Sequence, residues 1–78
     1  MDKYIALGHY LQNSNEMEIT LTFQEIENII ESSLPDSASN YRAWWANDIT
    51  HSQSKEWLNV GWNVINVNLG SEITFSKI

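Results

Sequence analysis

The hydrophobic positions of the first half of the chain change from helical spacing to strand spacing. Residues 3–11 predict a short helix, because large apolar side chains recur three and four positions apart: Tyr4, Leu7, Tyr10 and Leu11. After a polar turn at 13–15, Met17, Ile19 and Leu21 alternate with polar residues. This alternation predicts a strand with one buried face and one wet face that carries two carboxylates.

A second helix is predicted directly after this strand. Thr22 and Glu25 have capping-box spacing, in which a hydroxyl and a carboxylate each bind a free backbone N–H at a helix start. The apolar stripe that follows is Phe23, Ile26, Ile29 and Ile30. Glu27 and Glu31 are one turn apart on the outer side. We expect the helix to end near Ser32 or Ser33, because Pro35 disfavours helical geometry at Leu34.

The second half of the chain predicts a helical segment followed by a hairpin. Residues 37–41 suit a short helical turn. Thr50 and Gln53 offer a second capping pattern, for a helix that carries Trp57 and ends at Gly61. Residues 62–67 and 72–75 are predicted strands joined by a turn. The expected inner face of this hairpin is Ile65, Val67, Ile73 and Phe75.

These elements predict an α+β fold, a small three-stranded antiparallel sheet with about three helices packed on one face, in a single domain spanning residues 1–78. The chain is near the lower size limit for a stable core and contains no cysteine to crosslink it. All four tryptophans lie between positions 44 and 62. We expect Trp57 and Trp62 in the core. Of the consecutive pair, one ring should anchor the core and the other, Trp45, should be the more exposed.

The net charge of −6 is concentrated in the first half of the chain. Up to Asp36 there are seven acids and one lysine, whereas three acids balance three cations from Ser37 onward. This field repels phosphate backbones and favours a basic partner, although acids that merely keep a small domain in solution explain it equally well. No signal-peptide pattern or long apolar run is present, so we expect a cytoplasmic protein that does not enter a membrane.

The sequence carries no signature of an enzyme, a metal site or a cofactor site. Zinc-ligand spacing, a glycine-rich phosphate loop and a nucleophile elbow are all missing. Asp48, His51 and Ser52 are close in sequence, but sequence neighbours rarely adopt catalytic geometry. We expect the His51 ring to donate to a backbone carbonyl instead. We therefore predict no catalytic residue, no metal and no cofactor.

The segment from Arg42 to His51 is the predicted partner-binding edge. Exposed aromatic rings stack on single-stranded bases, and Arg42, Asn47 and Gln53 are residue types that read base edges. The chain has only four lysines and arginines, which argues against binding of a nucleic-acid phosphate backbone. If the chain recognises nucleic acid, we therefore expect it to bind a flipped base or a strand end. Tryptophan, tyrosine and arginine equally carry the energy of protein interfaces.

Several short motifs resemble a small bacterial and phage domain family of unknown function. They are Leu34-Pro35-x-Ser37-Ala38, Tyr41-Arg42-Ala43-Trp44-Trp45-Ala46-Asn47, His51-Ser52-Gln53, Trp57, Gly61-Trp62-x-Val64 and Ile73-x-Phe75. Because members of this family look like both stand-alone proteins and modules beside other domains, the resemblance implies recognition and not catalysis. This chain lacks the arginines and lysines expected around Ser39-Asn40 and at the C-terminus. That departure favours an acidic inhibitor.

The leading hypothesis is a non-enzymatic acidic protein that inhibits nucleic-acid-handling host machinery by protein contact, as a phage or mobile-element inhibitor of the anti-CRISPR or anti-restriction type. The alternative is a small nucleic-acid-recognition module. The predicted partner-binding residues are Arg42, Trp44, Trp45, Asn47, His51, Glu27 and Glu31. Either form is expected as a monomer or a homodimer.

Overall fold

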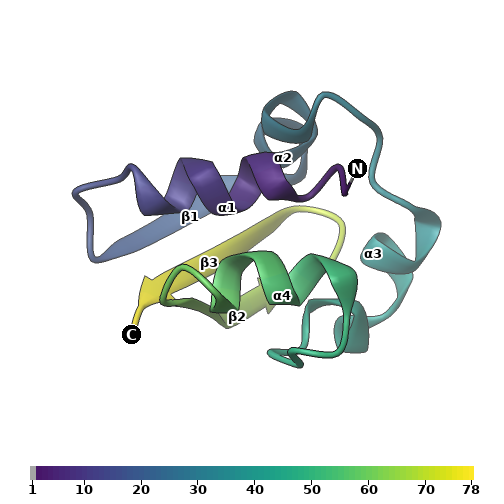
Figure 1. The fold of residues 1–78 in the computed structure, drawn as a ribbon. Helices are drawn as coiled ribbons and strands as arrows, with labels where there is room; N and C mark the ends of the chain where they lie inside the picture. The colour runs from purple at the N-terminus through teal and green to yellow at the C-terminus, as the bar shows by residue number, and fades with distance from the viewer. Residues whose placement is uncertain (1) are drawn as a thin grey trace.

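A computed structural model describes residues 2–78. In these residues four α-helices, one 3₁₀-helix and three strands follow one another (Figure 1). In chain order they are α1 (Ile5–Gln12), β1 (Glu18–Thr22), α2 (Phe23–Ile30), α3 (Asp36–Asn40), η1 (Arg42–Trp45), α4 (Ser52–Leu58), β2 (Trp62–Asn68) and β3 (Glu72–Lys77). The predicted α+β class is confirmed.

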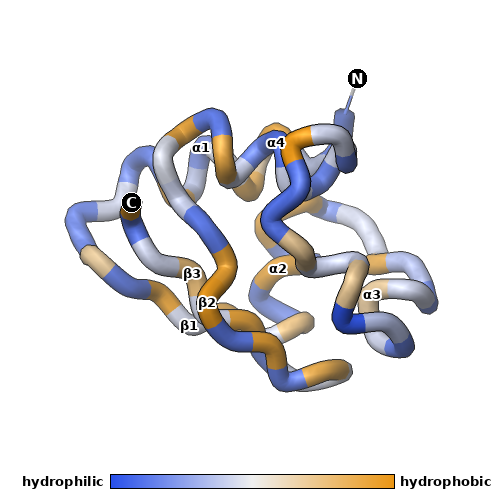
Figure 2. Tube along the Cα trace, turned by 90° about the horizontal axis from the view of Figure 1, so that it is seen from below, coloured by the Kyte–Doolittle hydropathy of each residue, from blue (hydrophilic) through white to orange (hydrophobic). Residues whose placement is uncertain are grey.

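The three strands form one antiparallel sheet in the order β1-β3-β2. The last strand lies in the middle, so β1 and β2 are both edge strands. Helices α1 and α4 lie side by side over one face of this sheet (Figure 1). Apolar and polar residues alternate along the strands (Figure 2). The face away from the helices is therefore polar, with Thr20 and Thr74 paired across it through their hydroxyls at 2.9 Å.

The core is built around a continuous chain of aromatic rings. Trp45 stacks on Trp57 with a centroid distance of 6.1 Å, and Trp57 meets the edge of Phe75 at 5.5 Å. Phe23 packs on Trp45 from the side of α2 at 5.4 Å. Trp45, Trp57 and Trp62 are at most 1% exposed. Because each large ring buries on the order of 150–250 Å², these side chains supply the core that a chain without disulfides needs.

Helix α2 has the N-terminus that its sequence predicted and an unexpected C-terminus. The capping box is present, since Thr22 Oγ1 accepts from the Glu25 backbone N–H and the Glu25 carboxylate accepts from the Thr22 N–H. The helix ends at Ile30, earlier than predicted, because Glu31 adopts left-handed geometry at φ 54°. The Ser32 N–H then returns to the Glu27 carbonyl.

Three positions predicted from alternation or capping are corrected by the structure. Met17 precedes β1 and is 67% exposed, so it does not belong to the buried face. A β-bulge between Val64 and Asn66 shifts the register of β2, which turns Ile65 out to solvent at 54% exposure and buries Val64 instead. The Thr50 hydroxyl does not cap α4, because it donates to the Asp48 carboxylate.

The two predicted C-terminal turns are confirmed by backbone geometry. Gly61 ends the segment after α4 at φ 83°, and its N–H binds the Leu58 carbonyl at 3.1 Å. Gly70 lies in the hairpin turn between β2 and β3 at φ 75°. Left-handed geometry of this kind costs glycine little and other residues more, which is why glycine marks both corners.

Candidate binding site

The short helix η1 sends two consecutive tryptophans in different directions. Trp45 enters the core and its indole N–H donates to the Ala38 carbonyl at 2.8 Å. Trp44 stays half-buried and meets the edge of the Tyr4 ring at 5.6 Å. Trp44, and not Trp45, is therefore the more exposed ring of the pair, contrary to the prediction. A 3₁₀-helix turns three residues per turn, so neighbouring side chains diverge by about 120°.

Asn47 fastens the segment after η1 to the edge of the sheet. Its side-chain N–H donates to the Val64 carbonyl and its Oδ1 accepts from the Val64 N–H, both at 2.8 Å. The same oxygen accepts from the Trp57 indole N–H at 3.0 Å. The amide of Asn47 thus takes the place of a neighbouring strand at Val64. Since these bonds occupy the groups that would read a base, the side chain holds the fold together at this point.

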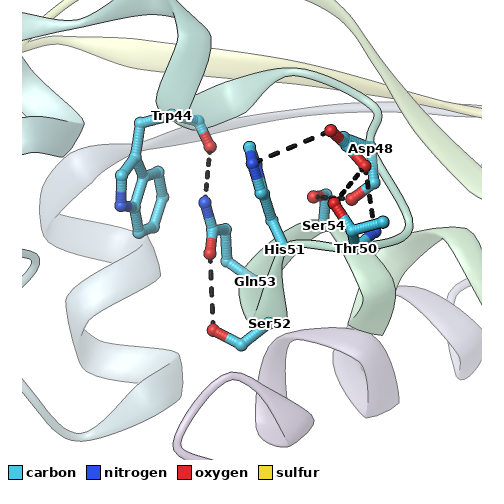
Figure 3. A network of polar contacts seen from close by, with 7 residues as sticks. All are labelled: Trp44, Asp48, Thr50, His51, Ser52, Gln53 and Ser54. Atoms are coloured by element: carbon cyan, nitrogen blue, oxygen red, sulfur yellow. Dashed lines mark hydrogen bonds and ion pairs between the residues drawn. The ribbon is translucent and has the colours of Figure 1, made fainter.

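Residues 48–54 form a polar turn that leads into α4 (Figure 3). Asp48 Oδ1 accepts from the Thr50 hydroxyl at 2.6 Å and from the Thr50 N–H at 2.9 Å. These two hydrogen bonds hold the pKa of the Asp48 carboxyl below its usual range. The Asp48 carbonyl accepts from the buried Ser54 hydroxyl at 2.6 Å, which fixes the turn against the first turn of α4.

His51 and Ser52 do not form a catalytic pair in this turn. The His51 Nε2 lies 3.7 Å from Asp48 Oδ2, and among the described residues the ring makes no hydrogen bond to the backbone carbonyl that we predicted. The Ser52 hydroxyl instead faces the Gln53 amide oxygen at 3.4 Å. In the part of the chain that the structure describes, the Ser52 hydroxyl and the His51 ring are therefore not hydrogen-bonded to each other.

A hollow of about 370 Å³ opens between η1 and the start of α4. We call it the Trp44 hollow; its lining is Ser37, Tyr41, Ala43, Trp44, His51, Ser52 and Gln53. In Figure 3 the Gln53 side chain runs between the rings of Trp44 and His51, and its N–H donates to the Trp44 carbonyl at 2.9 Å. The volume is at the small end of the usual range for ligand pockets, roughly 300–1,000 Å³, and suits one side chain or a small ring.

A second hollow, of about 430 Å³, lies on the other side of η1 beside the bulged strand β2. We call it the Arg42 hollow; its lining is Arg42, Ala43, Trp45, Ala46, Asn47, Val64, Ile65, Asn66 and Val67. Arg42 is exposed here, so the guanidinium is accessible. This lining contains one cation and no acid.

The structure thus separates the residues that the sequence grouped as one edge. Trp44 and His51 line one hollow, whereas Arg42, Trp45 and Asn47 line the other. Glu27 and Glu31 belong to α2 and line neither hollow. The Glu27 carboxylate accepts from the Leu34 N–H at 2.7 Å, so it stabilises the loop after α2, and Glu31 is exposed.

Five residues that line the Trp44 hollow were not among the predicted site residues: Ser37, Tyr41, Ala43, Ser52 and Gln53. Tyr41 is 65% exposed, and Gln53 is only 8% exposed with its amide in the hollow wall. The sequence contained a signal for Tyr41, which opens the motif that carries both tryptophans. Gln53 was named as a residue type that reads base edges and as part of a helix cap, but neither pattern indicated that its side chain would form a wall of the hollow.

Within residues 2–78 no cluster of three or more His, Asp or Glu side chains is placed to hold a metal ion. Over the same residues none of the helices has the length and apolar character needed to cross a membrane.

Comparison with known families gives one match. The model of the domain of unknown function DUF7662 matches residues 4–78. No curated protein and no solved structure matches the chain.

Proposed function

The chain belongs to the DUF7662 domain family, and we propose that it acts as a non-enzymatic binding module that contacts a basic protein partner through the Trp44 hollow. The supporting observation is that two aromatic residues, Trp44 and Tyr41, line the same hollow outside the core. Three tryptophans are buried, whereas Trp44 is half-buried beside the 65% exposed Tyr41. Aromatic residues in such positions carry much of the energy of protein interfaces.

The charge of the chain determines the kind of partner in this proposal. A net charge of −6 attracts basic surfaces and repels nucleic acid, and it increases the rate of association with a basic protein. Basic surfaces are characteristic of proteins that handle nucleic acids. The narrower form of the proposal is a cytoplasmic phage or mobile-element inhibitor of such host machinery, of the anti-CRISPR or anti-restriction type. It rests on size, acidity and family resemblance.

The test uses two exposed tyrosines as a matched pair. Tyr41 lines the Trp44 hollow, whereas Tyr10 is 45% exposed on α1 and lines neither hollow. The wild-type chain captures a partner from a bacterial lysate, and the partner is then purified. Its affinity should fall at least tenfold for Tyr41→Ser and remain unchanged for Tyr10→Ser, because interface anchors typically contribute about 2 kcal/mol or more. Equal affinity of both variants would exclude the hollow as the contact.

The acidic contribution needs a separate variant. Glu31→Lys reverses an exposed charge. Glu27→Lys would also break the hydrogen bond from the Leu34 N–H, so its effect on partner binding could not be separated from its effect on stability. Rate constants for association of wild type and Glu31→Lys, measured at low and high salt, should differ at low salt and converge at high salt. Identical rates at low salt would mean that this carboxylate is only solvated surface.

A nucleic-acid-recognition module is the second candidate, and the Arg42 hollow supports it. An exposed guanidinium beside the apolar residues Ile65 and Val67, with no acid in the lining, suits a base and its phosphate. Titration of tryptophan fluorescence with short single- and double-stranded oligonucleotides at low salt should show quenching in that case. A flat response at high DNA concentration would remove this candidate.

A further inference from the structure

We propose that the Trp44 hollow is a receptor for a single cationic side chain, a lysine or an arginine, of the protein partner. This inference rests on the proposed function and names the chemistry that the hollow recognises. Three features support it: the aromatic faces that line the hollow, a buried amide oxygen in its wall, and the absence of a lysine or arginine from its lining.

Within residues 2–78, no lysine or arginine makes a cation–π contact with the aromatic rings of the hollow. Lys3 Nζ lies 5.4 Å from the centre of the Tyr4 ring, and Lys77 Nζ lies 5.5 Å from that of Trp62. Both distances are within the limit of about 6 Å for a cation–π contact. Among the described residues, no lysine or arginine takes this position over Trp44 or Tyr41. A partner's ammonium or guanidinium group therefore finds two aromatic rings available.

The Trp44 ring is held in place before any partner arrives. Tyr4 and Trp45 contact it at centroid distances of 5.6 and 4.6 Å, both in edge geometry. The Gln53 side-chain N–H fixes the backbone of Trp44 from the other side. A ring that is already fixed loses little conformational entropy on binding, so even a single side-chain contact can contribute measurable affinity.

Gln53 supplies an oxygen acceptor in the wall. The side chain is more than nine-tenths buried, and its N–H donates to the Trp44 carbonyl, which defines the orientation of the amide. Its Oε1 accepts from the Ser52 hydroxyl at 3.4 Å, which is a long hydrogen bond, and an amide oxygen has a second lone pair. Ser37 and Ser52 also line the hollow, and hydroxyl oxygens can accept from N–H donors. Lysine and arginine side chains carry donors and no acceptors.

The charge of the chain as a whole favours a cation over a nucleotide at this hollow, whose own lining contains no acid and no lysine or arginine. The Asp48 carboxylate lies 3.7 Å from the His51 ring that lines the hollow, and the chain as a whole carries a net charge of −6. The lining has no lysine or arginine to hold a phosphate. A base could stack on Trp44, but its phosphate would gain no partner here, which distinguishes this hollow from the Arg42 hollow.

The experiment compares blocked tripeptides by NMR on the intact chain labelled with ¹⁵N. Acetyl-Gly-Lys-Gly-amide and acetyl-Gly-Arg-Gly-amide should shift the Trp44 indole signal and saturate, while the three buried indoles change little. The norleucine peptide, which has a similar hydrocarbon chain without charge, should bind about 2- to 30-fold more weakly, the factor that a cation–π contact supports. Uridine monophosphate is the probe for a base.

Variants then assign the effect to the hollow. Trp44→Leu should abolish the lysine and arginine response, and Trp44→Phe should weaken it, because tryptophan is the strongest aromatic partner for a cation. Tyr41→Ser should weaken the response, whereas Tyr10→Ser should leave it at the wild-type level. Thermal unfolding of each variant confirms that it is folded.

Several results would overturn the inference. Equal binding of the norleucine peptide would show an unselective apolar hollow, preferential binding of the nucleotide would show a base site, and saturating peptide without any shift would show no receptor at all. Each of these results can coexist with partner binding that depends on Tyr41, so failure of the inference is distinguishable from failure of the proposed function.

Discussion

Replacing Asn47 with alanine should destabilise this fold more than its position in a surface segment suggests. The side-chain amide satisfies the Val64 N–H, the Val64 carbonyl and the Trp57 indole N–H. Val64 is 8% exposed and Trp57 is fully buried. The substitution therefore removes the partner of three polar groups, at least one of which water cannot reach without a change in packing.

The expected loss of stability follows from these three groups. A buried donor without a partner costs about 1–3 kcal/mol. Counting the two N–H donors and allowing water to reach Val64, we expect the free energy of unfolding to fall by about 2–4 kcal/mol. A domain of this size has about 4–12 kcal/mol in total. Each kilocalorie lowers the melting temperature by roughly 4–8 °C, so the decrease should be about 10–25 °C.

Two further variants make the measurement specific. Asn47→Asp keeps an oxygen acceptor for the Val64 and Trp57 N–H groups but replaces the donor to the Val64 carbonyl with an oxygen that repels it, so its melting temperature should also lie below that of wild type. Asn66→Ala removes an exposed asparagine from β2, the strand to which Asn47 binds, and should change the free energy of unfolding by less than about 0.5 kcal/mol. Thermal and urea unfolding followed by circular dichroism provide the values. If Asn47→Ala has the same melting temperature and urea midpoint as Asn66→Ala, the Asn47 amide does not stabilise the edge of the sheet.

Three other substitutions test the packing, the backbone and the charges. In Gly8→Ala the added methyl would lie 2.7 Å from the Glu56 carbonyl oxygen. We therefore expect the free energy of unfolding, measured in urea, to fall by about 1–3 kcal/mol. No decrease would mean that α1 and α4 can move apart without cost. Glu31→Gly should raise stability by about 1 kcal/mol, because it relieves left-handed backbone geometry and removes a negative charge at a helix C-terminus; Glu31→Gln separates the charge from the backbone effect. The bonds from Thr50 lower the pKa of Asp48, so the stability that this carboxylate contributes is complete above the unfolded pKa near 3.8 and is lost as the pH falls through the lower folded pKa. Asp48→Asn should flatten that part of the acid-unfolding curve, and an unchanged curve would contradict this account.

The candidate site was predicted in part from the sequence. The motif with two tryptophans indicated where aromatic surface gathers, and Trp44 and His51 do meet in one hollow. The prediction that Trp45 is the more exposed tryptophan of the pair was wrong. The sequence cannot show that the Trp45 indole donates to the Ala38 carbonyl and stacks on Trp57. Asn47 was predicted as a contact for a partner, but its hydrogen bonds join it to a strand 17 positions away.

Local interactions alone determined much of this fold, because the groups involved are close in the sequence. The capping box of Thr22 and Glu25 and the glycine turns at Gly61 and Gly70 each depend on contacts within a few residues. The tertiary structure decided the strand order, the outward position of Ile65 and the division of the aromatic segment into two hollows. The physical reason is that burial and register depend on which distant strands and rings meet, and one bulged residue is enough to reverse the face of the side chains that follow it.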